Sequence, residues 1–229
     1  MESLDHMRNR LEKRYELTYD QLQWPGRTVE VCAVRNFDDL FQELLSKDPD
    51  HPDIQDERIP YWADLWPSSI ALGQYLLEQP PLAPGTTVLE VGAGLGLAGL
   101  AAHWQGGQVM LTDYLPEALE VARYLWALNG AEPYETAAMD WRAPDERFKA
   151  DLIIAADVAY ESRFFEPLIK TFRALLNPGG RILIAEPNRR VGQGWLHQMV
   201  DEGEADRVAQ LPVQFQKGHN TVDIYALRV

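Results

Sequence analysis

Short apolar runs alternate along most of the chain with longer segments in which apolar residues recur at helical spacing. Most of these runs are not interrupted by regularly spaced polar residues, which is typical of parallel strands that are buried on both faces. The pattern predicts strands at 88–91, 107–112, 134–139, 151–156 and 181–185, and helices at 67–79, 97–104, 116–129, 161–176 and 192–202.

The end of the chain follows a different pattern. A turn is expected at 177–180, and the segments 213–216 and 222–229 are spaced for a hairpin around residues 217–220. Alternating strands and helices followed by a hairpin predict an α/β fold with a doubly wound sheet and a late antiparallel strand.

Residues 1–59 precede this pattern and are expected to form an N-terminal α+β extension to a domain at 60–229. Apolar residues at near-helical spacing within 1–20 predict a helix or a partly ordered arm. A turn at 24–26, a strand at 28–34, a helix at 37–46 capped by Asn36 and a polar loop at 47–58 are expected to follow.

A glycine-rich turn follows the first strand of the main domain. Gly92, Gly94 and Gly96 lead directly into the helix expected at 97–104. Glycines let a ligand approach the backbone closely, and the helix N-terminus offers free N–H groups. Glu90 precedes the turn and suits a ligand that carries an amine better than a pyrophosphate. The third glycine falls one position early for the dinucleotide fingerprint, which disfavours a nicotinamide cofactor.

Polar residues stand where the next three strands end, at the edge where such sheets bind ligands. Asp113 is placed to accept hydrogen bonds from a ribose diol, or alternatively to cap the helix that begins at Pro116. Asp140 and Trp141 suit the amine and the ring of adenine, although Trp141 could instead be a structural loop residue. Asp157 follows the fourth strand and could serve in catalysis or cap the next helix.

Aromatic residues gather ahead of the helix at 67–79. Tyr61, Trp62 and Trp66 lie on the preceding loop, where aromatic side chains often line a pocket. For Trp62, a hydrophobic contact that closes the extension onto the core is the alternative.

Composition narrows the function further. The 229-residue chain carries 35 acidic and 21 basic residues, a net charge of −14, which disfavours a nucleic acid partner. Its one cysteine, Cys32, excludes an intrachain disulfide, and its five histidines are scattered, so no metal site is expected. Because it has neither a signal-peptide pattern nor an apolar run of ~20 residues, we expect a cytoplasmic protein without membrane contact.

Five stretches together resemble one family. They are Trp66-Pro67, the segment from Glu90 to Gly96, Asp113, Asp140-Trp141 and the Asp-Val-Ala-Tyr run at 157–160. In this combination, residues 60–187 resemble the class I methyltransferases that use S-adenosylmethionine (SAM), in particular the seven-strand protein-lysine methyltransferase group. The resemblance implies a Rossmann-like seven-stranded sheet that ends in an antiparallel hairpin.

The resemblance also implies roles for individual residues. Asp157 and Tyr160 would be catalytic and face the substrate nitrogen. SAM, which leaves as S-adenosylhomocysteine, would be bound by Trp66, Glu90, Gly92, Ala93, Gly94, Asp113, Tyr114, Asp140, Trp141 and Ala156.

The function implied is N-methylation of a lysine in a protein substrate by a monomeric enzyme. The main alternatives are a small-molecule amine N-methyltransferase and a non-catalytic SAM-binding interaction module. Residues 1–59 match no pattern that would identify the substrate.

Overall fold

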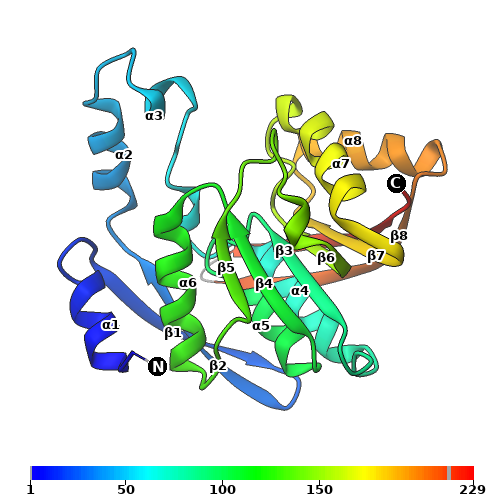
Figure 1. Ribbon diagram of the computed structural model, residues 1–229, viewed down its shortest axis with the longest axis horizontal. Coiled ribbons are helices and arrows are strands. Elements are labelled where there is room, and N and C mark those ends of the chain that lie inside the picture. Colours follow the sequence, from blue (N-terminus) through cyan, green and yellow to red (C-terminus); the bar gives the residue numbers. More distant parts are fainter. Residues whose placement is uncertain (1, 216–217) are drawn as a thin grey trace.

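A seven-stranded sheet forms the centre of the computed structural model, which describes residues 2–215 and 218–229 (Figure 1). The strand order is β5-β4-β3-β6-β7-β9-β8. Neighbouring strands from β5 to β7 are parallel, whereas β9 is antiparallel to both β7 and β8. The bounds are β3 (Thr87–Val91), β4 (Gln108–Asp113), β5 (Glu135–Ala138), β6 (Ala150–Ala156), β7 (Leu176–Glu186), β8 (Ala205–Phe215) and β9 (Gly218–Leu227). The predicted doubly wound sheet with its C-terminal hairpin is confirmed.

Helices cover both faces of this sheet and create two hydrophobic clusters. On one face lie α4 (Pro67–Glu78), α5 (Leu97–Trp104) and α6 (Pro116–Leu128), and on the other lie α7 (Phe165–Leu175) and α8 (Arg190–Asp201). Because strand side chains alternate between faces, Val88 joins the first cluster while Leu89 and Val91 join the second. Proline at the start of α4 and α6 suits the first helical turn, where its missing N–H has no intrahelical partner.

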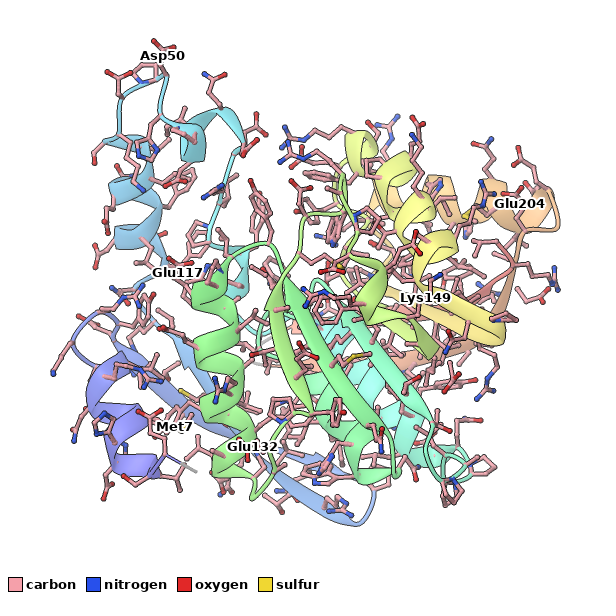
Figure 2. All side chains as sticks on the ribbon, in the orientation of Figure 1. Met7, Asp50, Glu117, Glu132, Lys149 and Glu204 are labelled. Carbon is pink, nitrogen blue, oxygen red and sulfur yellow. The ribbon has the colours of Figure 1, made fainter. Side chains whose placement is uncertain are left out.

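The N-terminal extension consists of α1 (Leu4–Leu11), β1 (Leu17–Trp24), β2 (Arg27–Val34), α2 (Phe37–Leu45) and α3 (Pro52–Gln55). The two strands form a separate antiparallel sheet, which lies with α1 beside α6 (Figure 1). Met7, buried between α1 and α6, joins this region to the main core (Figure 2). Asp50, at the tip of the segment between α2 and α3, lies far from the sheet.

Four local expectations differ from the structure. Residues 17–24 form a strand instead of continuing a helix or arm, because β2 supplies their hydrogen-bonding partner. The Asn36 side chain does not cap α2 but accepts a hydrogen bond from the N–H of Glu16 at 3.0 Å. The loop at 47–58 contains the short helix α3, and the helix expected from 161 begins at Phe165, after a 3-10 turn.

The C-terminal half also differs in detail. Residues 177–180 belong to β7, where the ladder with β6 shifts its register, so they form an irregularity in a strand instead of a separate turn. Strand β8 begins at Ala205, earlier than expected, because it pairs with the whole length of β9. In the expected hairpin turn, residues 218–220 belong to β9, whereas residues 216 and 217 lie outside the described residues.

Candidate active site

A cavity of about 360 Å³ lies at the carboxyl ends of β3, β4, β5 and β6. Strands β3 and β6 are neighbours whose helices cover opposite faces of the sheet, and ligands bind at such a switch point in open α/β sheets. The cavity is within the size range of small-molecule sites. Ten of the twelve residues expected at the site line it, namely Trp66, Gly92, Gly94, Asp113, Tyr114, Asp140, Trp141, Ala156, Asp157 and Tyr160.

The glycine turn forms the floor of this cavity. Gly92 and Gly94 have φ angles of +65° and +51°, a region that residues with a Cβ adopt at a cost. A Cβ atom on Gly92 would also lie 2.8 Å from Cγ1 of Val158 and 3.0 Å from Cζ2 of Trp141. Backbone angle and close packing therefore both require glycine at position 92.

Asp113 holds the turn from the neighbouring strand. Its Oδ2 accepts a hydrogen bond from the Gly94 N–H at 2.9 Å, and its Oδ1 accepts one from the Leu115 N–H at 3.0 Å. Burial raises the pKa of Asp113 above its ordinary value, and these backbone donors oppose that rise. The residue at the N-cap of α6 is Leu115, so Asp113 precedes the capping position and does not fill it.

Glu90 lies behind the turn, on the α5 side of β3. Its side chain is buried, and its Oε2 accepts a hydrogen bond from the Gly99 N–H at 2.9 Å. Burial raises its pKa to about 8. Neither Glu90 nor Ala93 is among the residues that line the cavity. The Glu90 side chain therefore anchors the first turn of α5, and its expected contact with a ligand amine stays a prediction.

Asp140 and Trp141 follow β5 and occupy one side of the cavity. The Asp140 carboxylate is paired with Arg142, whose Nη2 lies 2.6 Å from Oδ2, and this hydrogen bond lowers the pKa of Asp140. The Trp141 ring packs edge-on against Phe164 at a centroid distance of 5.4 Å. Its indole N–H is buried and finds no acceptor in the part of the chain that the structure describes.

The segment 55–59 crosses the cavity from one side to the other. On one side, Asp56 accepts a hydrogen bond from the Tyr114 hydroxyl at 2.6 Å and pairs with Arg142 at 3.1 Å. On the other side, Glu57 pairs with Arg163 at 2.5 Å. Residues that precede position 60 therefore complete the site. The division of the chain into 1–59 and 60–229 remains a prediction.

Asp157 follows β6 and is held in a strained conformation. Its φ is +64°, and its N–H donates to the carbonyl of Ala185 at 3.0 Å. The side chain is only 6% exposed. Neither carboxylate oxygen has a hydrogen-bond partner among the described residues, but Oδ1 forms an ion pair with Nη2 of Arg189. The residue at the N-cap of α7 is Phe164, so Asp157 does not cap that helix.

Aromatic rings surround the cavity near Asp157. The Tyr160 ring lies 5.4 Å from that of Tyr61 and 5.5 Å from that of Phe164, and Tyr61 lies 6.1 Å from Trp66. Burial raises the pKa of Tyr160, so its hydroxyl is neutral at physiological pH. Trp62 lines the cavity and also packs edge-on against Tyr15 at 5.5 Å, which combines the pocket and core roles considered for it.

Comparison with known proteins identifies the family. Residues 54–202 match the family model described as lysine methyltransferase, which covers more than half of the chain. The chain belongs to the lysine methyltransferase family. The electron transfer flavoprotein beta subunit lysine methyltransferase of Xenopus laevis is 34% identical over 57% of this chain and 53% of its own length.

Two further comparisons describe the range of the family and its fold. The histone-arginine methyltransferase METTL23 of Homo sapiens is 32% identical over 52% of this chain and 65% of its own length. The chain thus spans less than two thirds of these curated relatives. Magnesium protoporphyrin IX methyltransferase from Synechocystis PCC 6803, solved with bound SAM, superposes with a TM-score of 0.54 over 85% of this chain and 92% of its own, at 14% identity. This likeness shows a shared fold.

The residues of this family member suit SAM. The positive-φ glycines at 92 and 94 leave space where side chains would otherwise project. Asp113 lines the cavity, and its carboxylate oxygens, which accept the Gly94 and Leu115 N–H groups, can accept further hydrogen bonds. Trp141 lines the cavity with a ring on which a planar group could stack, and its indole N–H has no acceptor among the described residues. The cavity therefore combines aromatic and apolar walls with charged groups that can orient such a ligand.

Sequence reasoning missed two parts of this site. It read 47–58 as a loop without a role, although Asp56 and Arg58 both contact the Tyr114 hydroxyl. It also assigned no role to Arg189, which pairs with Asp157. Charged residues are common on polar loops, so the local sequence carries no signal that separates these from ordinary surface residues.

Neither a membrane-spanning helix nor a metal-binding group was found in the described structure. None of the helices within 2–215 and 218–229 is long and apolar enough to span a bilayer. No group of three or more His, Cys, Asp or Glu residues in these ranges is arranged to hold a metal ion.

Proposed function

We propose that this chain is a SAM-dependent methyltransferase that methylates a lysine side chain of a protein substrate. The observation that carries the proposal is the Asp157 carboxylate, which is nearly buried at the cavity and whose one cationic partner in the described structure is the partly exposed Arg189. A buried carboxylate of this kind favours a cationic partner, and a lysine ammonium group is one. Membership of the lysine methyltransferase family supports the same activity.

In this proposal, Asp157 orients the substrate amine and receives its proton, directly or through water. The free lysine amine has an ordinary pKa near ~10.4, so it must lose a proton before it can act as a nucleophile. SAM, when bound, would supply an electrophilic methyl group whose S–C bond electrons would remain on sulfur, so that the protein mainly aligns the reactants. Tyr160 and Tyr61 form an aromatic wall beside the amine.

The surface charge supports a protein as the acceptor. A net charge of −14 repels a phosphate backbone and attracts a basic segment that carries a lysine. We also propose that the enzyme acts as a monomer. Sedimentation of the purified protein tests this point directly.

The activity is tested by transfer of labelled methyl groups from SAM into an extract of the source organism, resolved by size. We expect a discrete labelled protein, and mass spectrometry of that protein should locate the methyl group on a lysine. Asp157→Asn should abolish most of the label while SAM binding is retained. Asp201→Asn, at an exposed position near the end of α8, is the matched control and should keep the label.

Other outcomes would change the assignment. Label on arginine would move the proposal toward the activity named for the human relative. Label confined to small molecules would indicate a small-molecule amine N-methyltransferase. SAM binding without label in any fraction would indicate a non-catalytic SAM-binding module, and unchanged label with Asp157→Asn would remove that residue from catalysis.

A further inference from the structure

Arg189 lies directly beside the candidate catalytic carboxylate. It follows β7 and stands at the N-cap of α8, after Asn188, whose φ is +62°. Its Nη2 pairs with Oδ1 of Asp157 and donates to the Asp157 carbonyl at 3.3 Å. Its guanidinium carbon also lies 6.0 Å from the centre of the Trp66 ring. A cation is therefore already held between a carboxylate and an aromatic face at this point.

A second buried carboxylate holds the same arginine from the other side. The side-chain Nε of Arg189 lies 3.3 Å from Oε1 of Glu186, and the backbone N–H of Arg189 donates to the same oxygen at 3.2 Å. Glu186 is 1% exposed, and its Oε2 has no hydrogen-bond partner among the described residues. One guanidinium thus bridges two buried carboxylates through different atoms.

Other cations near the site are engaged elsewhere. Arg163 pairs with Glu57 and Glu161, and Arg142 pairs with Asp56 and Asp140. Within the described structure, Arg189 is the one cation paired with Asp157.

We propose that Arg189 occupies the position at Asp157 that the cationic side chain of the substrate takes during binding. The incoming ammonium group replaces the guanidinium at Asp157, and Arg189 remains paired with Glu186. This inference deepens the proposed function, because it assumes that the acceptor presents a positively charged side chain. The ligand class is a primary alkylammonium group on an unbranched aliphatic stem.

Three features make this exchange physically feasible. The Arg189 side chain is 36% exposed, so its outer end can turn toward solvent without repacking of the core. Glu186 anchors Nε, so the arginine keeps one partner when the other is lost. Asp157, in contrast, is nearly buried and would be costly to leave unpaired. In the substrate-free protein, Arg189 keeps Asp157 paired, and the affinity for the substrate is lower as a result.

The exchange is tested by binding of n-butylammonium, a mimic of the lysine side chain, to the SAH-bound protein. NMR titration or calorimetry measures this binding without methyl transfer. Arg189→Gln should bind the probe roughly tenfold more tightly, because the internal competitor is lost. Glu186→Gln should instead weaken probe binding, because Arg189 then keeps Asp157 as its one carboxylate partner.

Matched controls separate this effect from a general structural one. Arg190→Gln changes the exposed neighbouring residue and should leave the affinity unchanged. Neutral n-butanol should bind the wild-type protein and Arg189→Gln equally. Adding Asp157→Asn to Arg189→Gln should remove the gain, and thermal unfolding confirms that each variant is folded.

The proposal is overturned if Arg189→Gln leaves probe binding unchanged or weakens it, or if no variant binds the probe. A purely positioning role for Arg189 predicts weaker binding in both Arg189→Gln and Glu186→Gln. Failure of the proposed function is a separate result, because a tightened probe site combined with no protein labelling would retain the cation exchange and reject the methylation of a protein lysine.

Discussion

Asp113 and Gly94 are joined across two neighbouring strands, since the Gly94 N–H donates to Oδ2 of Asp113 at 2.9 Å. The carboxylate at the end of β4 therefore fixes the turn that follows β3. The same carboxylate lines the cavity. A side chain expected to bind the ligand directly thus also shapes the backbone beneath it.

Asp113→Ala should weaken SAM binding by at least tenfold, because it removes both the acceptor for the ribose and the anchor of the glycine turn. Asp113→Asn keeps the side-chain shape and one acceptor oxygen, so its loss of affinity should be smaller. Calorimetric titration with SAM and with SAH measures both variants. A SAM dissociation constant that stays the same in Asp113→Ala would exclude this residue from the ribose site.

Gly92→Ala should lower both stability and SAM affinity. The new Cβ would meet Val158 and Trp141 in addition to adopting a positive φ. Gly26→Ala is the matched control, because Gly26 has a φ of +72° but open space around its missing side chain. We expect Gly26→Ala to cost about 1 kcal/mol of unfolding free energy, from backbone strain alone. Urea unfolding should show a larger loss for Gly92→Ala, and equal losses would contradict the packing argument.

Arg142→Ala should speed the release of SAM. This substitution removes the ion pair that ties Asp56, and with it the segment 55–59, to the Asp140 side of the cavity. Arg147→Ala is the control, since Arg147 also pairs with an aspartate two residues earlier but does not contact that segment. Stopped-flow measurement of SAM dissociation should show faster release in Arg142→Ala alone. Equal rates in the two variants would mean that the segment does not retain the ligand.

Glu90 should make the folded protein less stable as pH rises toward 8. Burial raises its pKa from 4.5 to about 8. Between these two pH values the folded protein holds a proton on Glu90 that the unfolded chain has released. The stability that this proton contributes is complete below pH 4.5, decreases as pH rises and is fully lost above pH 8. The expected slope reaches about 1.4 kcal/mol per pH unit.

Glu90→Gln isolates this effect, because glutamine keeps an acceptor for the Gly99 N–H but does not titrate. The unfolding free energy of wild type minus that of Glu90→Gln, measured by urea denaturation from pH 5 to 8, should fall with pH. Glu186, whose burial raises its pKa to about 7, is present in both proteins and cancels in this difference. A constant difference would show that Glu90 ionises normally in the folded state.

Local sequence patterns were sufficient for the main architecture. Consecutive apolar residues located β3, β4 and β6 within a residue or two, because strands buried on both faces need apolar side chains on both faces. The ends of those strands lie at one edge of a parallel sheet. The placement of Gly92, Asp113 and Asp157 around one cavity therefore followed from their positions directly after parallel strands.

Contacts between distant parts of the chain could not be obtained in this way. Most of strand β1 is exposed or half-buried, and it forms because β2 pairs with it. Asp56 reaches Tyr114 and Arg142 from positions 58 and 86 residues away, and Arg189 reaches Asp157 from the start of α8. Hydrophobic periodicity reports which residues are buried, whereas the partner of a charged side chain depends on the three-dimensional path of the whole chain. The pattern of the sequence thus located the cavity, and tertiary folding selected the charged groups that close it and that neutralise Asp157.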